Sequence, residues 1–159
     1  MKLISILSFA LMVAGLLGLI YIHSLFSASP VVIALQAIAV ALMVWARLTF
    51  GMRSFHAAAD PTEGGLVTTG PYRYVRHPIY TAVVLFSLAG ALAHISLTAA
   101  GLALAIFIGA LGRMLAEERL LSARYPEYIE YAAHTPRILP CRRQPKHARI
   151  VKKSFGGRT

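Results

Sequence analysis

The sequence predicts an all-α integral membrane protein with about four transmembrane helices. Of its 159 residues, 57% are hydrophobic and only 14% are charged, whereas a soluble domain is about one quarter charged. Apolar runs without Lys, Arg, Asp or Glu cover residues 3–22, 31–46 and 78–112. All 16 Lys and Arg residues lie outside these runs, and they would gather on one membrane face if the chain crossed four times.

The first apolar run, residues 3–22, is about twenty residues long, which suffices for a spanning helix. Because Lys2 gives it a positive start, a secretory signal peptide is the alternative. The run is longer than the usual core of a signal peptide, however, and Pro30 follows the Ser-Ala-Ser sequence that would have to be cleaved. We therefore expect residues 1–29 to form a retained anchor and its loop.

The second run, residues 31–46, contains one strongly polar residue, Gln36, which is expected to face another helix. The third run, residues 78–112, would be about 52 Å long as one straight helix at about 1.5 Å per residue. This length exceeds the ~30 Å of a bilayer core. We therefore expect a helical hairpin that turns near residues 94–98.

Residues 113–131 mix charged and apolar side chains at three- and four-residue spacing. This pattern predicts an amphipathic helix that continues out of the membrane into the cytoplasm. Pro126 would interrupt or restart it. We place a membrane core at residues 30–140 and a basic tail at 141–159, where Lys and Arg occur without any acidic residue. The tail is expected to bind anionic lipid headgroups.

The charge distribution predicts the orientation in the membrane. With four spanning helices, Lys2, the connection at 47–77 and everything after the third run share one face and carry all 16 basic residues. Since basic segments stay in the cytoplasm, we expect both termini there, in a bacterial inner membrane. The single cysteine, Cys141, cannot form an intrachain disulfide, and no two histidines have zinc-site spacing. We therefore expect no protein-held metal, and no nucleic-acid-binding motif is visible.

A polar stretch from Gly70 to Tyr80, GPYRYVRHPIY, leads into the third apolar run. Pro78 suits the first position of a helix, which places His77 just before the helix and Tyr80 on its first turn. Helix N-termini attract anions, and polar side chains at the edge of a membrane segment often mark a site. The alternative is an interfacial belt in which Arg76 extends toward the headgroups.

Two adjacent carboxylates, Glu117 and Glu118, follow the third apolar run within two helical turns. One interpretation is an interfacial cluster of salt bridges with neighbouring arginines. The other is recognition of a cationic or hydroxylated ligand, because carboxylates accept hydrogen bonds from ammonium and ribose groups. Arg137, in the sequence TPRILP, suits a clamp for a carboxylate or phosphate, or simple attraction to anionic lipid. The residues alone leave these alternatives open.

Two motifs, LVTTGPYRYVRHPIY and EERLLSARYPEYIEYAAHTPRILP, resemble the isoprenylcysteine carboxyl methyltransferase family and the related phospholipid methyltransferases. LTFGMRSF at 48–55 is also similar to that family, so the resemblance covers residues 45–140. It implies S-adenosylmethionine as methyl donor, bound at the cytoplasmic edge. It places the catalytic roles on Tyr80, Glu118 and Arg137, with Arg137 on the substrate side. The implied cofactor contacts are Gly70, Pro71, Tyr72, Arg76, His77, Pro78, Tyr80, Glu117 and Glu118.

The resemblance therefore predicts S-adenosylmethionine-dependent methyl transfer to a lipophilic acceptor that enters from the bilayer. The carboxylate of a prenylcysteine-like compound needs no base and would favour an arginine in the site. A lipid amine headgroup must lose a proton, which would favour a carboxylate or tyrosine. The sequence holds both kinds of group, so the acceptor stays open. The alternative functions are an NADPH-dependent membrane reductase of sterol-reductase type and a non-catalytic lipid-binding membrane protein.

Overall fold

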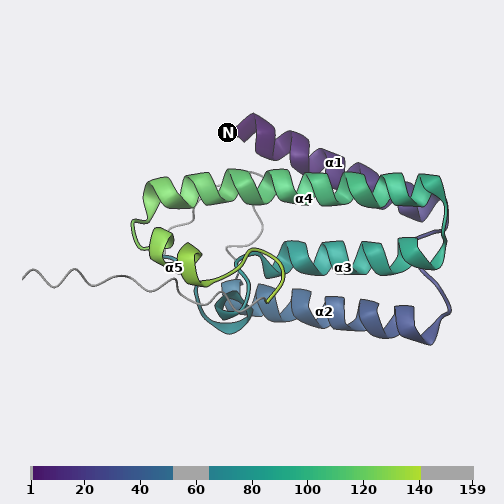
Figure 1. Ribbon diagram of the computed structural model, residues 1–159, viewed down its shortest axis with the longest axis horizontal. Helices are drawn as coiled ribbons and strands as arrows, with labels where there is room; N and C mark the ends of the chain where they lie inside the picture. The colour runs from purple at the N-terminus through teal and green to yellow at the C-terminus, as the bar shows by residue number, and fades with distance from the viewer. Residues whose placement is uncertain (1, 52–64, 141–159) are drawn as a thin grey trace, which may run out of the picture.

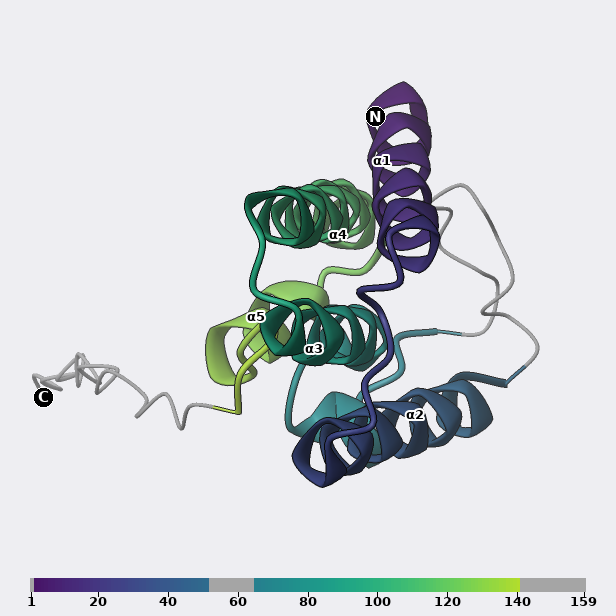
Figure 2. The same ribbon diagram turned by 90° about the vertical axis from the view of Figure 1, so that its right-hand side faces the viewer.

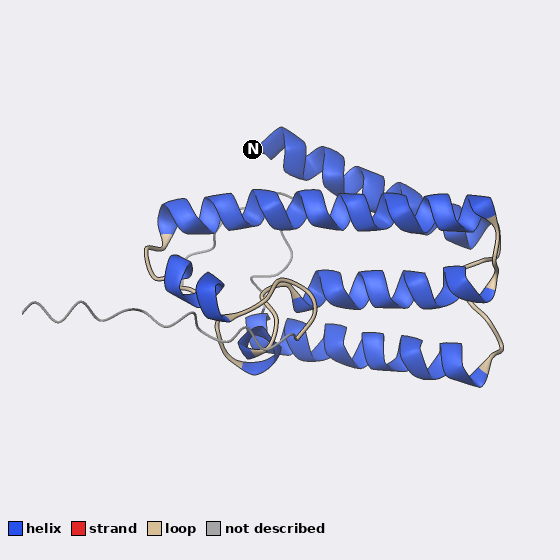
Figure 3. Ribbon diagram, viewed as in Figure 1, coloured by secondary structure: helices blue, strands red, loops and turns tan. Residues whose placement is uncertain are grey.

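The computed structural model describes residues 2–51 and 65–140, and within these ranges it contains helices and turns but no strand (Figure 3). The prediction of an all-α chain is confirmed for this part. The predicted basic tail at 141–159 lies outside the described residues, so its binding to lipid stays a prediction. In chain order the elements are α1 (Lys2–Tyr21), α2 (Pro30–Phe50), the 3-10 turn η2 (Gly70–Arg73), α3 (Pro78–Ala93), α4 (Leu97–Arg124) and α5 (Tyr128–His134).

The four long helices run along the bundle and are joined at its ends (Figure 1). α1 packs along α4, and α3 lies between α4 and α2 (Figure 2). The turns at 22–29 and 94–96 are at one end of the bundle, whereas η2, α5 and the start of α3 are at the other end. The polar segments on both sides of the third apolar run are therefore brought to the same end.

Within the described ranges, three helices, α1, α2 and α4, are long and apolar enough to cross a membrane. They leave large apolar side chains exposed, such as Leu7 on α1, Ile38 on α2 and Leu104 on α4. α3 has 16 residues, about 24 Å at 1.5 Å per residue, which is less than the ~30 Å of a bilayer core. A fourth crossing, by α3, therefore stays a prediction.

The helix boundaries follow local sequence signals. Pro30 and Pro78 occupy the first positions of α2 and α3, where the missing N–H of proline costs nothing. The predicted hairpin is confirmed, because α3 ends at Ala93 and α4 begins at Leu97. The Ser96 hydroxyl oxygen accepts a hydrogen bond of 3.0 Å from a backbone N–H in the first turn of α4, which caps that helix.

The segment predicted to continue out of the membrane begins as part of α4. This helix runs without a break through the charged residues to Arg124, and the chain turns at Pro126 before α5 begins at Tyr128. Proline has no backbone N–H to donate within a helix, which explains the interruption at Pro126. The amphipathic cytoplasmic character predicted for residues 113–131 stays a prediction.

Glycines allow α1 and α4 to approach closely. A Cβ atom at Gly109 would lie 2.6 Å from the carbonyl oxygen of Ser8, and one at Gly15 would lie 2.6 Å from the side chain of Ile106. Neither distance leaves room for a side chain, and small residues are the usual means by which membrane helices pack. These contacts set the position of α1 along α4, and so decide which α1 residues reach the charged end of α4.

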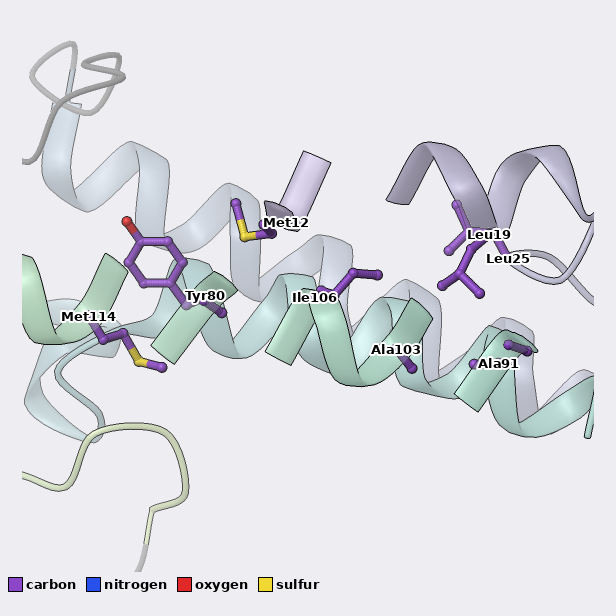
Figure 4. Close-up of a cluster of buried hydrophobic side chains, with 10 residues drawn as sticks. Met12, Leu19, Leu25, Tyr80, Ala91, Ala103, Ile106 and Met114 are labelled. Carbon is purple, nitrogen blue, oxygen red and sulfur yellow. The ribbon is translucent and has the colours of Figure 1, made fainter. Parts of the chain in front are cut away.

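The core lies between α1, α3 and α4 and extends from the hairpin end to the polar end (Figure 4). On α2, Gln36 is buried, and its Nε2 donates to the carbonyl oxygens of Leu25, at 2.7 Å, and of Phe86 on α3, at 3.4 Å. The expectation that Gln36 faces another helix is confirmed. The buried core side chains include Met12, Leu19, Tyr80, Ile106 and Met114.

Candidate functional site

Residues 135–138 lie along the N-terminal end of α3. The backbone N–H of Arg76 donates to the carbonyl oxygen of Pro136 at 2.8 Å, and that of His77 donates to Arg137 at 3.1 Å. The Thr81 hydroxyl adds a hydrogen bond of 3.3 Å to the carbonyl of Ile138. This pairing joins the two sequence motifs through their backbones and presents their side chains to the charged end of α4.

Glu118 on α4 is bonded by cations from both motifs. Its Oε1 lies 3.1 Å from His77 Nε2 and 3.3 Å from Arg76 Nη1. Arg137 approaches both carboxylate oxygens, with Nε 2.9 Å from Oε1 and Nη2 2.8 Å from Oε2. Only 12% of the Glu118 side chain is exposed. A carboxylate that is this well buried is costly unless cations and hydrogen-bond donors pair with it, as they do here.

Glu117 faces the other side of the same histidine. Its Oε2 lies 3.7 Å from His77 Nδ1, and its Oε1 accepts hydrogen bonds from the Tyr80 hydroxyl and, at 3.2 Å, from Arg113 Nη2. His77 therefore stands between two carboxylates, with each ring nitrogen directed toward one of them. Of these two contacts, the one with Glu118, at 3.1 Å, has the length of a hydrogen bond.

Arg113 extends this polar network toward α1. Its Nε donates to the Tyr80 hydroxyl at 2.9 Å and its Nη1 to the Ser5 hydroxyl at 3.1 Å, while the guanidinium lies 5.4 Å from the centre of the Phe9 ring. The sequence pointed to Arg113 only as a neighbour of the glutamates, and it gave no role to Ser5. The one available signal was that the first apolar run contains two serines, Ser5 and Ser8, since such residues often make contacts between membrane helices.

α5 adds two tyrosines to the site, Tyr128 and Tyr131. Tyr128 is only 2% exposed, and its hydroxyl accepts a hydrogen bond of 3.2 Å from Arg76 Nη1. The Tyr131 hydroxyl donates to the carbonyl oxygen of Tyr72 at 2.6 Å. Burial, followed by the charge of Glu118, raises the pKa of the Tyr128 hydroxyl. Both tyrosines therefore belong to the wall of the site.

The predicted backbone contacts at Gly70, Pro71 and Tyr72 fall in η2. Gly70 has a φ of 57°, which glycine adopts readily, and a Cβ there would lie 2.5 Å from the Thr49 hydroxyl oxygen. The Tyr72 ring packs against the Phe50 ring in a tilted arrangement, with 5.6 Å between centroids. Burial, and after it the nearby charge of Glu117, raises the pKa of the Tyr72 hydroxyl. The hydrogen bond from the Tyr131 hydroxyl to the Tyr72 carbonyl connects η2 to α5.

The charged cluster, here the side chains of Arg76, His77, Arg113, Glu117, Glu118 and Arg137, has an excess of cations. Three guanidinium groups face two carboxylates, so the cluster carries one net positive charge when His77 is neutral. The Arg76 Nε atom is buried and has no hydrogen-bond partner among the residues described. Nowhere in 2–51 and 65–140 do three His, Cys, Asp or Glu side chains group as a metal site would require. The cluster is therefore suited to polar or anionic ligand groups.

A groove of about 480 Å³ adjoins the site at Tyr131. Residues of the loop before η2, Leu66 and Thr68, form one side, and the other side comes from Glu127, Glu130 and His134 around α5. Its size is within the range of small-molecule sites. Tyr131 is the lining residue that also belongs to the wall of the site, and the charged cluster itself does not line the groove.

Comparison with known proteins assigns the chain to a family. The model of the isoprenylcysteine carboxyl methyltransferase family matches residues 28–123, which is more than half of the chain. The cobalt-zinc-cadmium resistance protein CzcN of Cupriavidus metallidurans is 33% identical over 113 residues, covering 70% of this chain and 50% of that protein. The nickel-cobalt-cadmium resistance protein NccN of Alcaligenes xylosoxydans is 42% identical over 77 residues, or 47% of this chain and 36% of that protein.

The chain therefore spans half or less of the length of these two relatives, and no solved structure matches it. The family match includes His77 just before α3, Tyr80 on α3 and both glutamates of the charged cluster on α4. Together with three helices of membrane-spanning length, it identifies an integral membrane protein. The chain belongs to the isoprenylcysteine carboxyl methyltransferase family, a family of membrane methyltransferases.

Proposed function

We propose that this protein transfers a methyl group from S-adenosylmethionine to a lipophilic acceptor at the cytoplasmic face of the membrane. The observation that carries the proposal is the convergence of His77, Tyr80 and both glutamates at one end of an apolar bundle. A polar cofactor reaches such a site from water, and a lipophilic acceptor reaches it from the bilayer. Family membership supports the reaction class.

The residues present fit this cofactor. Its carboxylate requires donors, and Arg76 offers a buried Nε without a described partner. Its ammonium and ribose hydroxyls require acceptors, which Glu117 and Glu118 supply. When bound, S-adenosylmethionine contributes a methyl group on a sulfonium. The protein contributes position and exclusion of water, because an in-line displacement depends mainly on holding the two reacting atoms in line.

Arg137 is proposed to orient an acidic acceptor. A guanidinium binds a carboxylate through two parallel hydrogen bonds, and Arg137 makes this arrangement with Glu118. An acceptor carboxylate would balance the excess positive charge of the cluster, whereas an amine acceptor would add to it. An amine would also need a base, for which Tyr80 and Glu117, hydrogen-bonded to each other, are the candidates. We therefore favour an acidic acceptor.

The orientation in the membrane is part of the proposal. The positive-inside rule supports cytoplasmic termini, with the charged cluster on the cytoplasmic side and α3 as a short fourth span, in a bacterial inner membrane. The two curated relatives are named for resistance to cobalt, cadmium and either zinc or nickel. We propose metal stress as the physiological setting, which growth of a deletion strain in cobalt and cadmium would test.

Calorimetric titration tests the cofactor directly. S-adenosylmethionine, and separately NADPH, is titrated into the full-length protein in lipid nanodiscs. We expect micromolar binding of S-adenosylmethionine and none of NADPH. Glu118→Gln should weaken the binding at least tenfold, whereas Arg119→Gln, the loss of an exposed charge at the next position, should not. NADPH binding alone would favour a reductase, and binding of neither compound to a folded protein would favour a non-catalytic lipid-binding role.

A further inference from the structure

Arg113 is a buried cation on a helix of membrane-spanning length. The residue is 6% exposed, although it follows sixteen residues of α4 that carry no charge. A charge at such a position is costly unless its donors are paired. The guanidinium is planar with donors in a fixed fork, so each partner constrains the direction of the others.

Three of its partners come from three different helices. Nη1 donates to Ser5 of α1 at 3.1 Å, Nε donates to Tyr80 of α3 at 2.9 Å, and Nη2 donates to Glu117 of α4 at 3.2 Å. Phe9, one turn after Ser5, places its ring 5.4 Å from the guanidinium, within the range of a cation–π contact. α1 therefore contacts one side of the Arg113 guanidinium. The other side contacts Tyr80 and Glu117, two residues that are predicted to bind the cofactor.

The position of Ser5 is set by the packing of α1 on α4. Ser5 is fully buried, and one turn further along α1 the Ser8 carbonyl lies against Gly109. α1 also precedes the matched residues 28–123, so the family model does not cover this contact. Removal of the Ser5 hydroxyl would leave the α1–α4 glycine contacts in place and would take away the acceptor of the Arg113 Nη1 hydrogen bond.

We propose that Ser5 is a positioning residue of the methyltransferase site. By accepting a hydrogen bond from Arg113 Nη1, it fixes the guanidinium plane, and the guanidinium then holds the Tyr80 hydroxyl and the Glu117 carboxylate in their binding positions. This inference rests on the proposed function, in which Tyr80 and Glu117 contact the cofactor. α1 is accordingly a part of the site as well as a helix of membrane-spanning length.

The test compares two residues of equal shape at one position. Ser5→Thr keeps the hydroxyl and Ser5→Val replaces it with a methyl group, so any difference in fold caused by added bulk is common to both. S-adenosylmethionine is titrated into each full-length variant in lipid nanodiscs, and thermal unfolding is recorded in parallel. We expect Ser5→Val to bind about tenfold more weakly than Ser5→Thr, the size expected for loss of a hydrogen bond to a charged group.

Two further comparisons distinguish positioning from general packing. Ser8→Ala removes a hydroxyl one turn away on the same helix and should leave the Kd within twofold of that of the wild type. Ser5→Ala should raise the Kd about tenfold in the wild-type background but should not raise it in an Arg113→Lys background. A residue that acts through Arg113 has no separate effect once the planar guanidinium donors are lost.

Equal affinities of Ser5→Thr and Ser5→Val would overturn the proposal, as would additive effects of Ser5→Ala and Arg113→Lys. A folded wild type that does not bind S-adenosylmethionine would instead overturn the proposed function, and the inference with it. These failures are distinguishable, because the first two occur with a wild type that binds the cofactor.

Discussion

Arg137 and Glu118 form a two-point ion pair that links residues 135–138 to α4, with N–O distances of 2.9 Å and 2.8 Å. The two partners differ in exposure, because 47% of the Arg137 side chain is accessible against 12% for Glu118. Hydrogen bonding to Glu118 raises the pKa of the Arg137 guanidinium. The exposed partner is the one that can turn toward a ligand while Glu118 keeps His77 and Arg76.

This difference predicts that Arg137 affects turnover more than folding. Arg137→Ala should lower methyl transfer to an acidic acceptor at least tenfold, while the free energy of unfolding changes by about 1 kcal/mol or less because the side chain is half exposed. N-acetyl-S-farnesylcysteine is a suitable acidic probe, assayed by transfer of radiolabelled methyl. Arg137→Lys keeps the charge but not the fork, and should recover only part of the activity. Unchanged turnover in Arg137→Ala would remove Arg137 from the substrate side.

His77 is predicted to hold the two carboxylates in place. His77→Phe keeps a ring of similar size at a position that is 5% exposed, but it removes both nitrogen contacts. We expect S-adenosylmethionine binding to weaken more than tenfold and stability to fall by about 1–3 kcal/mol, since Glu117 and Glu118 each lose a partner. Thermal unfolding and calorimetry measure the two effects.

His94→Phe is the matched control for that change. His94 lies at the opposite end of α3, where its Nδ1 contacts the carbonyl oxygen of Gly90 at 3.1 Å. Its replacement should leave cofactor affinity unaltered. If both histidine variants bound the cofactor as the wild type does, the carboxylates would not depend on His77 and the charged cluster would be only structural.

The sequence predicts the helices well because their signals are local. Long uncharged runs specify the apolar helices, and Pro30, Pro78 and Pro126 mark two starts and one interruption. The assignment of His77 and Glu118 to one site came from two motifs that resemble a family.

Contacts between distant elements were the part that sequence reasoning missed. Tyr128 has the interfacial pattern of a belt residue, and only the return of residues 135–138 to the start of α3 places it under Arg76. Ser5 reaches Arg113 because glycines set how far α1 extends along α4. A single sequence does not show which face of an apolar helix packs against another helix, because lipid and protein interior are equally apolar.

Gly70 should be intolerant of a side chain. It has a φ of 57°, and a Cβ would lie 2.5 Å from the Thr49 hydroxyl oxygen. We expect Gly70→Ala to cost about 1–3 kcal/mol of stability through backbone strain and the clash. Gly65 also has a positive φ, of 82°, but a Cβ added there would have no described atom within 4 Å. Gly65→Ala should therefore cost less, and thermal unfolding of the two variants separates the steric clash from the strain.

Two glycines of α4 provide a test of how α1 is held. At Gly109 an added Cβ would meet the Ser8 carbonyl oxygen at 2.6 Å, whereas at Gly101 no described atom lies within 4 Å. Gly109→Ala should destabilise by about 1–3 kcal/mol, because the backbone of α1 has to move away. Gly101→Ala should be neutral or stabilise by up to about 1 kcal/mol, since alanine favours the helix.

The same pair connects packing with the site. A shift of α1 away from Gly109 also withdraws Ser5 from Arg113, so Gly109→Ala should weaken S-adenosylmethionine binding several-fold at a temperature where the variant is still folded. Gly101→Ala should bind as the wild type does. Calorimetry below the unfolding transition measures this effect separately from stability. If Gly109→Ala were destabilised but bound the cofactor normally, α1 would serve the bundle without serving the site, because its displacement would not have reached Tyr80 or Glu117.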